Sequence, residues 1–558
     1  MSSFYTNIQL AGDTILYRGY ENGEAVQYRT SFSPTLYVLS KKKEKFTTLD
    51  GRYVSPVKFH NAREAREFIK QYEHVDNFEV HGYERFVYQF IRQQYPDDVD
   101  YHIDQMKIYA LDIEVQCENG FPDVEAAAEE MLSITIKDMV TKKFYIWAVR
   151  EFETEHEHYI YDSERDMLKG FLEWWVHNTP DILTGWNVNL YDVPYIARRL
   201  NRILGEKWMR SLSPWNRANE REIYVQGRKN YAYDVSGINI LDYLDLYRKF
   251  TYSNQESYRL DHIAFVELGQ RKLDHSEYEN FRDFYTRDWQ KFIEYNIQDV
   301  ELIDRLEDKM KLLELAITMS YDAKVNFEDV YSQVRMWDTM IYNYLADKNI
   351  VPPPRKGSKK DEKYAGAYVK EPVPGKYDWV VSFDLNSLYP HLIMQYNISP
   401  ETLWETRHPS ANVERLLNQE VDLSGKFAVC ANGAQYRKDI RGFLPEMMEK
   451  IYNERVIYKK RMIQAKKDYE KTPTKQLEKD ISKFNNIQMA RKIQLNSAYG
   501  AVGNQYFRYY NLLNAEAITL SGQVSIRWIE NKMNQKMNKI LKTEDVDYVI
   551  ASDTDSIY

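Results

Sequence analysis

One carboxylate, Asp384, stands at the end of an apolar stretch in the C-terminal half of the chain. Residues 380–383 predict an apolar strand that leads to it, and the chain then turns through Ser387 toward a further apolar run that begins at Tyr389. A carboxylate at a strand end, followed by exposed backbone amides, suits a hard cation that holds a triphosphate. This stretch therefore predicts phosphate-transfer chemistry, if other charged groups meet it.

Two further carboxylates, Asp553 and Asp555, lie near residue 558. The residues around them predict a hairpin, with one strand over 548–551, a turn over 552–554 and a partner strand that begins at 556. Phosphate transfer needs acidic groups for metal ions and basic groups for the triphosphate. These two carboxylates extend the acidic set that begins with the earlier strand.

Basic side chains at helical spacing supply the other half of that requirement. Residues 446–471 contain no Gly or Pro and many helix formers, and a second helix is predicted to run through Leu495. Two i and i+4 pairs each present one face, and the two faces could converge on a triphosphate: Arg455 with Lys459, and Lys492 with Asn496. The alternative is an ordinary solvated helical hairpin.

A separate acidic pair, Asp112 and Glu114, lies in the N-terminal half. Residues 107–115 predict a strand, and side chains at i and i+2 share one face of a strand. Two like charges ~4 Å apart repel by about 4 kcal/mol at an effective dielectric of 20, and a cation would relieve that repulsion. The alternative is a solvated strand face.

Two later segments add to this pair. Asp192 follows a Gly-Trp-Asn turn and precedes a predicted amphipathic helix that ends near residue 200. Residues 292–300 predict another helix, on which Tyr295 and Asp299 share a face. An ordinary amphipathic helix is the alternative for this last segment.

The composition is that of a soluble protein with several domains. The chain has 558 residues, of which 43% are hydrophobic and 28% charged, and its length predicts about three to five domains. No apolar run is long enough to span a bilayer, and the first residues lack the pattern of a signal peptide. Two cysteines exclude a disulfide framework and a cysteine zinc site, and they favour a reducing cytosol.

Charge is unevenly distributed along the chain. The net charge of −9 argues against nucleic-acid binding over the whole surface. Residues 445–495 nevertheless hold 13 Lys or Arg and 7 Asp or Glu, a net charge of +6. A basic segment inside an acidic protein fits a local phosphate contact.

The remaining segments predict structure more than chemistry. Residues 1–103 alternate short apolar runs with polar turns, and residues 221–237 predict a hairpin around Gly227. Residues 301–348 are helical in pattern. Residues 351–361 are rich in Pro, Gly and Lys, which predicts a linker or a domain boundary.

The segments 380–390, 492–500 and 553–556 resemble, in this order, motifs A, B and C of the family B DNA polymerases, and the T-even-phage type above all. Residues 107–115, 184–195 and 292–300 resemble the three motifs of the DnaQ-like proofreading exonucleases. The resemblance covers essentially the whole chain. Two features depart from the T-even type: Ala551 and Ser552 precede the motif C aspartates, and the basic helical hairpin is shorter.

The resemblance implies a multidomain fold of the α/β and α+β classes without a thumb. Its parts would be an N-terminal domain, an RNase H-like exonuclease domain, a palm with an antiparallel sheet and fingers formed by a helical hairpin. The implied bounds are 1–103 for the N-terminal domain, completed by 311–355, then 104–310 for the exonuclease, 356–444 and 496–558 for the palm, and 445–495 for the fingers.

For the exonuclease site, the resemblance implies that four carboxylates hold two divalent ions and that Tyr295 orients the attacking water. The carboxylates are Asp112, Glu114, Asp192 and Asp299. The implied cofactor is Mg²⁺, with Mn²⁺ as an alternative because both ions suit carboxylate ligands, and two ions are expected in each active site. The hairpin at 221–237 stands where phage-type enzymes carry a strand-separating hairpin, and a plain surface hairpin is the alternative.

For the polymerase site, the resemblance implies that Asp384 and Asp555 hold both metal ions, with the Leu385 carbonyl and Asp553 supporting that shell. Tyr389 would stack under the sugar and exclude a 2′ hydroxyl, and Lys492 would protonate the leaving pyrophosphate. The implied nucleotide contacts are Ser387, Leu388, Tyr389, Arg455, Lys459, Lys492 and Asn496. The implied DNA contacts are Tyr364, Gly366, Tyr499 and Gly500.

The implied partners are primer–template DNA, deoxynucleoside triphosphates and a second polypeptide. Members of the family continue past motif C with the rest of the palm, the thumb and a clamp-binding tail, whereas this sequence stops at Tyr558. We therefore expect a split polymerase of phage DNA replication, acting in the cytoplasm of an infected bacterium, whose C-terminal subunit also contacts the sliding clamp; an incomplete reading frame or a boundary artefact is the alternative. No membrane partner is expected.

Two other functions compete with this expectation. The first is a stand-alone 3′–5′ exonuclease with a non-functional polymerase half. The second is a non-catalytic fragment that binds nucleic acid. Intact acidic and cationic positions at both sites favour the polymerase with proofreading, and metal-dependent nuclease and synthesis assays separate the three.

Overall fold

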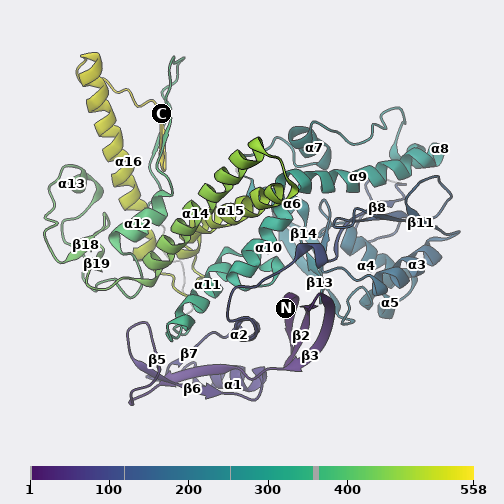
Figure 1. Cartoon of the computed structure of the whole chain (residues 1–558), viewed down its shortest axis with the longest axis horizontal. Helices are drawn as coiled ribbons and strands as arrows, with labels where there is room; N and C mark the ends of the chain where they lie inside the picture. The colour runs from purple at the N-terminus through teal and green to yellow at the C-terminus, as the bar shows by residue number, and fades with distance from the viewer. Residues whose placement is uncertain (1–2, 119, 252, 356–363) are drawn as a thin grey trace. The chain divides into compact units, whose positions relative to one another are not determined.

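The structure is a computed structural model that describes residues 3–118, 120–251, 253–355 and 364–558. Most of the predicted linker, residues 356–361, lies outside the described residues. The chain forms two compact units, one made of residues 1–34, 59–65 and 85–331, and the other of residues 35–58, 66–84 and 332–558. Figure 1 follows the chain through both units. The predicted domain bounds stay predictions.

The described residues of the first unit form three sheets. β1 (Ser3–Ala11), β2 (Thr14–Glu21) and β3 (Glu24–Ser31) form an antiparallel meander. A six-stranded sheet has the order β11-β10-β9-β8-β12-β15. Its strands are β8 (Ile108–Val115), β9 (Met131–Asp138), β10 (Phe144–Ala148), β11 (Glu157–Ile160), β12 (Ile182–Thr184) and β15 (Asn239–Ile240). β13 (Ala218–Val225) and β14 (Arg228–Val235) form the predicted hairpin, with its turn at Gln226–Gly227.

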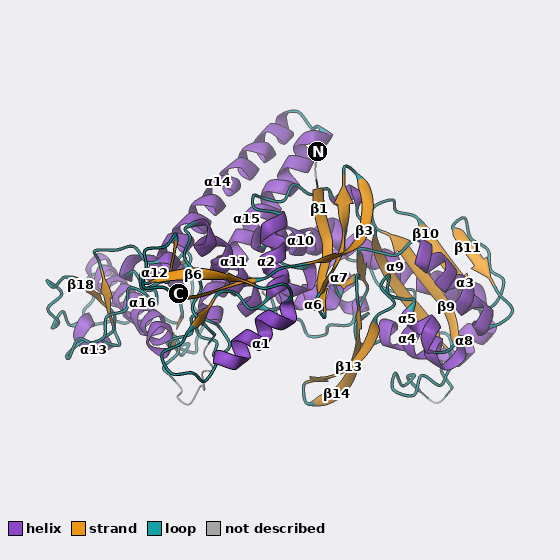
Figure 2. Ribbon diagram, turned by 90° about the horizontal axis from the view of Figure 1, so that it is seen from below, coloured by secondary structure: helices purple, strands orange, loops and turns teal. Residues whose placement is uncertain are grey.

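Helices cover both faces of the six-stranded sheet (Figure 2). Alternate residues of β8, such as Leu111 and Ile113, pack against α3 (Glu164–His177) and α4 (Asp192–Ile203) in the largest apolar core of this unit. The polar residues that alternate with them, such as Asp112, face α9 (Trp289–Met310). The strand period of two thus separates a core face from a face that carries carboxylates.

The other helices of this unit lie around these layers. They are α2 (Phe86–Gln94), α5 (Glu206–Arg210), α6 (Tyr243–Phe250), α7 (Leu260–Leu268), α8 (Phe281–Arg287) and α10 (Leu312–Ala323), with short 3₁₀ turns at Ile103–Gln105 and Phe327–Tyr331. α1 (Ala62–Tyr72) has residues in both units. α9, α10 and α11 (Gln333–Asp347) confirm the helical pattern predicted over 301–348.

The second unit begins with a small sheet of order β5-β6-β4-β7, formed by β4 (Thr35–Leu39), β5 (Phe46–Thr47), β6 (Tyr53–Lys58) and β7 (Val80–His81). Its helical core joins α11 (Gln333–Asp347), α12 (Leu388–Tyr396), α14 (Phe443–Lys471), α15 (Lys475–Val502) and α16 (Leu512–Leu541). α13 (Val413–Leu417) and the pair β18 (Phe427–Val429) and β19 (Gln435–Arg437) complete it. The two long helices α14 and α15 confirm the predicted helical hairpin.

A four-stranded antiparallel sheet of order β16-β20-β21-β17 carries the C-terminal acidic residues, as predicted. The strands are β16 (Val369–Lys370), β17 (Phe383–Asp384), β20 (Ser552–Asp553) and β21 (Ser556–Ile557). Figure 1 shows the C-terminus beside α16.

Two strand predictions for this sheet were wrong in extent. The strand expected over 380–384 is reduced to its last two residues, because β21 is the one strand that pairs with it in the described part of the chain. The hairpin strand expected over 548–551 is β20 at 552–553, and the turn lies at 554–555, where Thr554 adopts φ 55°. Residues 550 and 551 still exchange backbone hydrogen bonds with Tyr558, at 2.9 and 3.0 Å.

Among the described residues, no helix combines the length and the apolar character needed to cross a bilayer.

Candidate active sites

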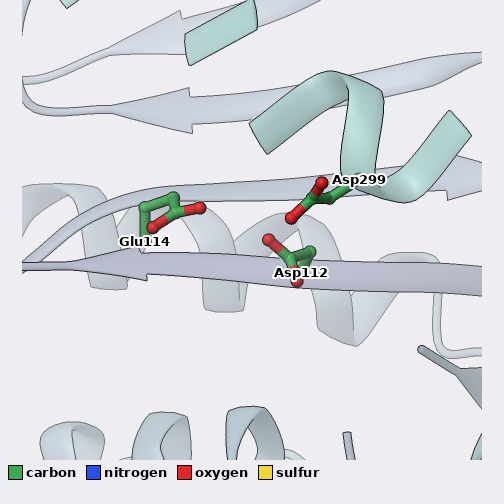
Figure 3. Close-up of side chains that lie close together, drawn as sticks. All are labelled: Asp112, Glu114 and Asp299. Carbon is green, nitrogen blue, oxygen red and sulfur yellow. The ribbon is translucent and has the colours of Figure 1, made fainter. Parts of the chain in front are cut away.

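Three carboxylates of the first unit converge at one point (Figure 3). Asp112 and Glu114 come from β8 and Asp299 from α9, and each offers an oxygen that lies within 4.8 Å of the others. Asp299 is 2% exposed and Glu114 is 8% exposed. The sequence predicted that these three residues act together, and the fold brings them together.

A buried amide fixes the first of these carboxylates. Asn296 of α9 is fully buried, and its Nδ2 donates to Asp112 Oδ2 at 2.6 Å. Its Oδ1 accepts from the hydroxyls of Ser133 and Thr135 on β9, at 3.1 and 2.5 Å. The amide therefore links two strands to the helix. A polar residue on the buried face of a predicted helix was the signal that could have identified it.

Asp192 lines the same cleft but lies outside the group of three. It is the first residue of α4, and its Oδ1 accepts the backbone N–H of Ile113 at 3.0 Å. The turn before it is held by buried Asp242, which accepts the N–H groups of Asn187 and Asn189 at 3.0 Å each and caps α6. Sequence analysis did not single out Asp242.

Burial and mutual repulsion weaken the acidity of these groups. Burial, together with the charges of Asp192, Asp299 and Glu114, raises the pKa of Asp112 well above its ordinary value. Burial and the charge of Asp299 raise the pKa of Glu114 in the same way, and burial raises that of Asp192 to about 7. Carboxylates that are held close together despite burial and repulsion fit a site for divalent cations.

A lysine that the sequence analysis missed enters this cluster. Lys272 Nζ forms an ion pair with Asp299 and donates to the Tyr295 hydroxyl at 3.0 Å. Burial lowers the pKa of Lys272, but the neighbouring charges of Asp299, Tyr295 and Asp112 outweigh burial and raise it overall. Lys272 lies in a loop without periodic pattern, so nothing in its sequence context indicated a role.

Two aromatic side chains, Phe121 and Tyr191, lie at the rim of the cleft around these residues. Phe121 is 82% exposed, and its ring centroid lies 5.0 Å from that of Tyr191. Arg282 and Glu118 form an ion pair of 2.7 Å beside it. The other lining residues include Ile113, Val115, Cys117, Trp186, Asn187, Asn280 and Phe281. An exposed ring next to a buried acidic cluster offers a stacking surface for a base.

The second acidic set lies on the sheet of the second unit. Asp384 and Asp555 are neighbours: the Leu385 N–H donates to the Asp555 backbone carbonyl at 2.8 Å, and Ser556 Oγ donates to Asp384 Oδ1 at 3.3 Å. Burial and the charge of Asp384 raise the pKa of Asp555. Asp553 lies on β20 and accepts from the Thr554 hydroxyl at 2.9 Å.

This second set is more open than the first. Asp384 and Asp553 are exposed, and in the part of the chain that the structure describes the second set does not form a group of three carboxylates as close as the first. The hydroxyl of Ser556 lies within hydrogen-bond distance of both Asp384 and Asp555, at 3.3 and 3.4 Å.

The basic hairpin reaches the turn that follows Asp384. Arg455 Nη1 on α14 lies 3.3 Å from Ser387 Oγ and 3.4 Å from Asn386 Oδ1. Ser387 has φ 53° and precedes α12. Glu454 and Arg491 form an ion pair of 2.6 Å that joins α14 to α15. Lys459 is exposed on α14, Lys492 is half-buried on α15 and Asn496 is exposed on α15.

Three tyrosines meet beside this turn. The rings of Tyr389 and Tyr499 lie 4.7 Å apart, and the hydroxyls of Tyr364 and Tyr499 lie 2.9 Å apart. Gly366 accepts from Gln523 Nε2 at 2.7 Å through its carbonyl. Leu388, the first residue of α12, is buried, and a Cβ at Gly500 would lie 2.7 Å from Gln333 Oε1. Arg455 thus lies at the turn, and Tyr389, Tyr499 and Tyr364 form a chain of contacts beside it.

Comparison with known proteins places the chain in a family. Residues 324–558 match the family described as DNA polymerase family B, and residues 83–263 match its exonuclease domain. The chain is 31% identical to the DNA-directed DNA polymerase of Escherichia phage RB69 and 32% identical to that of Enterobacteria phage T4; each match covers the whole chain and 69% of the relative.

A more distant relative is the DNA polymerase of Pyrococcus glycovorans, which is 25% identical over 82% of the chain and 53% of its own length. Both halves of the chain thus match one family, and the two phage relatives match it from end to end. The chain belongs to the family B DNA polymerases and carries their exonuclease domain.

Proposed function

We propose that this chain takes part in phage DNA replication by adding deoxynucleotides to a primer and by removing mispaired nucleotides from its 3′ end. The observation that carries the proposal is the buried cluster of Asp112, Glu114 and Asp299 in a cleft with an exposed aromatic rim. Family membership supports the polymerase half of the proposal.

The residues of the first site fit divalent cations. Burial and the charge of Asp299 raise the pKa of both Asp112 and Glu114, so a shared cation would stabilise their charged forms, and hard oxygen ligands suit Mg²⁺ or Mn²⁺. Asp112, Glu114 and Asp299 would hold the ions, with Asp192 at the same cleft as the fourth ligand. Bound ions would supply an activated water and stabilise the oxygen that leaves.

The protein's own groups then position the substrate. Tyr295 orients the attacking water through its hydroxyl, and Lys272 holds that hydroxyl in place by donating to it. The exposed ring of Phe121 stacks on a base near the 3′ end, since aromatic side chains bind single-stranded ends in this way. The buried amide of Asn296 keeps Asp112 turned toward the cleft.

At the second site, Asp384 and Asp555 would hold the ions that nucleotide transfer needs, with the Leu385 carbonyl and Asp553 in support. Tyr389 stacks under the incoming sugar, and its contact with Tyr499 supports the ring. The triphosphate is bound by the turn at Ser387 and Leu388 and by the side chains Arg455, Lys459, Lys492 and Asn496, and Lys492 protonates the pyrophosphate. Tyr364, Gly366, Tyr499 and Gly500 contact the primer–template.

The proposal also concerns partners. Synthesis by this chain would use primer–template DNA and deoxynucleoside triphosphates, the partners that family membership supports. The chain matches 69% of the length of each of the two phage relatives.

The deciding experiment uses the purified chain, an end-labelled primer–template and Mg²⁺, with and without deoxynucleotides. We expect the primer to shorten without deoxynucleotides and to extend when they are present, and we expect Asp112→Asn to abolish shortening. Absence of Mg²⁺-dependent shortening would overturn the exonuclease, and absence of extension with deoxynucleotides would overturn the polymerase.

A further inference from the structure

Basic side chains gather at the end of the helical hairpin where α14 connects to α15. Residues 459–483 hold nine Lys or Arg and four Asp or Glu, a net charge of +5 in a chain whose net charge is −9. The connecting residues 472–474 are exposed. This end of the hairpin is therefore a local positive surface on an acidic protein.

The two helices lie side by side and pack through one face each (Figures 1 and 2). The ring centroids of Tyr458 on α14 and Phe484 on α15 lie 6.1 Å apart. Residues seven apart share one side of a helix. Ala465, seven residues after Tyr458, is buried, and Arg491, seven residues after Phe484, pairs with Glu454 of α14 at 2.6 Å. These residues mark the inner faces of the hairpin.

Six lysines lie on the opposite, outer faces, at roughly 180–260° around each helix axis from the ring that faces the other helix. All six are exposed, and none of their side chains forms an ion pair with another described residue. Exposed cations without acidic partners favour an anionic ligand. We call them the outer lysines: Lys460, Lys467 and Lys471 on α14, and Lys475, Lys479 and Lys483 on α15.

The outer lysines form one row along each helix. At a rise of 1.5 Å per residue, Lys467 lies about 10 Å along α14 from Lys460, and Lys471 lies about 6 Å farther on. A row of fixed positive charges of this length can neutralise several phosphates of one nucleic-acid strand.

The shape of the hairpin favours a single strand over a duplex. The two rows face away from each other, so no flat surface presents both. Duplex DNA is stiff, with a persistence length of about 150 base pairs, and does not bend around two packed helices. A flexible single strand can follow the row on α14, pass the connecting residues 472–474 and continue along α15.

We propose that the outer lysines bind the phosphate backbone of single-stranded DNA, as a contact separate from both acidic sites. The proposal rests on the proposed polymerase function, which identifies the strand as uncopied template. Arg455, which lies at the Ser387 turn, is five residues before Lys460 and thus roughly 140° around α14 from it. A strand on the outer lysines therefore leaves the nucleotide contacts uncovered.

The test measures binding of a fluorescein-labelled oligothymidylate to the full chain by anisotropy, in EDTA so that the strand is not hydrolysed. The variant combines Lys460→Gln, Lys467→Gln and Lys471→Gln, and glutamine keeps a high helix propensity. Each phosphate contact on a single strand contributes about 0.7 to the slope of log K against log[NaCl]. We expect the variant's slope to be shallower by about 2 and its affinity at about 0.1 M NaCl to be at least tenfold lower.

A matched control combines Lys532→Gln, Lys536→Gln and Lys539→Gln. These exposed lysines lie at i, i+4 and i+7 on α16 in the same unit, so the control removes the same charge from a helix of similar length. The control is expected to bind the oligothymidylate as the wild type does. Equal helical content in circular dichroism shows that neither variant is misfolded.

The same three proteins separate this proposal from the proposed function. Failure of the proposed polymerase would appear as absence of primer extension in all three. Failure of this proposal would appear as equal salt slopes for the α14 variant and the wild type. An equal loss of affinity in the α16 control would also overturn the proposal, because net charge alone would then explain the effect.

Two further measurements test the single strand and the second row. A blunt duplex of the same length is expected to bind more weakly than the single strand. A duplex that binds as tightly and is weakened equally by the α14 variant would assign the outer lysines to duplex DNA and overturn the proposal. Lys475→Gln, Lys479→Gln and Lys483→Gln together should also reduce the slope by about 2, and an unchanged slope would overturn the path across both helices.

Discussion

Replacing Asp112 with asparagine should make the metal-free protein more stable while it abolishes the response to Mg²⁺. The substitution removes one charge from the buried cluster and keeps an oxygen that can accept the bond from Asn296. Most substitutions of buried polar residues destabilise a protein, so an increase in stability is a demanding test of the argument.

The size of the effect follows from the distances. Two full charges separated by the 4.8 Å limit of the cluster repel by roughly 3 kcal/mol at an effective dielectric of 20. The ammonium of Lys272 offsets part of that repulsion. We therefore expect Asp112→Asn to raise the free energy of unfolding by about 2 kcal/mol in EDTA.

Urea denaturation at pH 7.5, with EDTA or with Mg²⁺, measures both parts of the prediction. A ligand at one hundred times its dissociation constant stabilises the wild type by about 2.7 kcal/mol, and this gain should vanish in the variant. The control is Asp304→Asn. Asp304 is 3% exposed and pairs with Lys137 and Lys142 at 2.6 Å, so its loss should destabilise the protein by about 3 kcal/mol and leave the Mg²⁺ response intact.

The reasoning fails if Asp112→Asn lowers the stability in EDTA, because the carboxylates would then not repel one another in the folded state. It also fails if the variant gains as much stability from Mg²⁺ as the wild type, because the ion would then bind elsewhere.

Three further predictions concern single residues. Lys272→Met should slow single-turnover primer hydrolysis about 100-fold by releasing the Tyr295 hydroxyl, and an unchanged rate would contradict that role. Phe121→Ala should raise the KM for single-stranded DNA about tenfold, since stacking contributes about 1–3 kcal/mol; an unchanged KM would exclude stacking. Burial raises the pKa of Glu307 from 4.5 to about 7, so this group opposes folding above pH 7 and not below pH 4.5. The wild type should gain about 2 kcal/mol from this group between pH 7.5 and pH 5, and Glu307→Gln should lack that gain in urea titrations at both values.

The sequence was most informative where the site residues are spaced with the period of a strand or a helix. The spacing of Asp112 and Glu114 on a strand placed both on one face, and the structure confirms the strand and their proximity. The helix with Tyr295 and Asp299 was predicted for the same reason. The period of a strand or a helix predicts which side chains share one face of that element. The order of the three exonuclease-like segments indicated that these faces form one site.

Other parts of the sites depend on tertiary contacts that no local pattern records. Lys272 reaches the cluster from an irregular loop, and Asp242 acts on a turn more than fifty residues before it. The predicted strand around Val381 is mostly absent for a related reason. A strand needs a second strand to pair with, and local β propensity does not show whether one is present. The predicted roles of the individual site residues stay predictions.

The helical hairpin of α14 and α15 has a mechanical consequence. Its buried residues lie mostly at one end, from Phe443 to Ile451 on α14 and from Asn486 to Val502 on α15, while the connecting residues 472–474 are exposed. A helix of 29 residues is about 43 Å long, so a rotation of about 10° at the packed end moves the free end by roughly 7 Å. A small change in packing around Met447 and Met448 would therefore move the connecting residues 472–474 by more than the pitch of a helix.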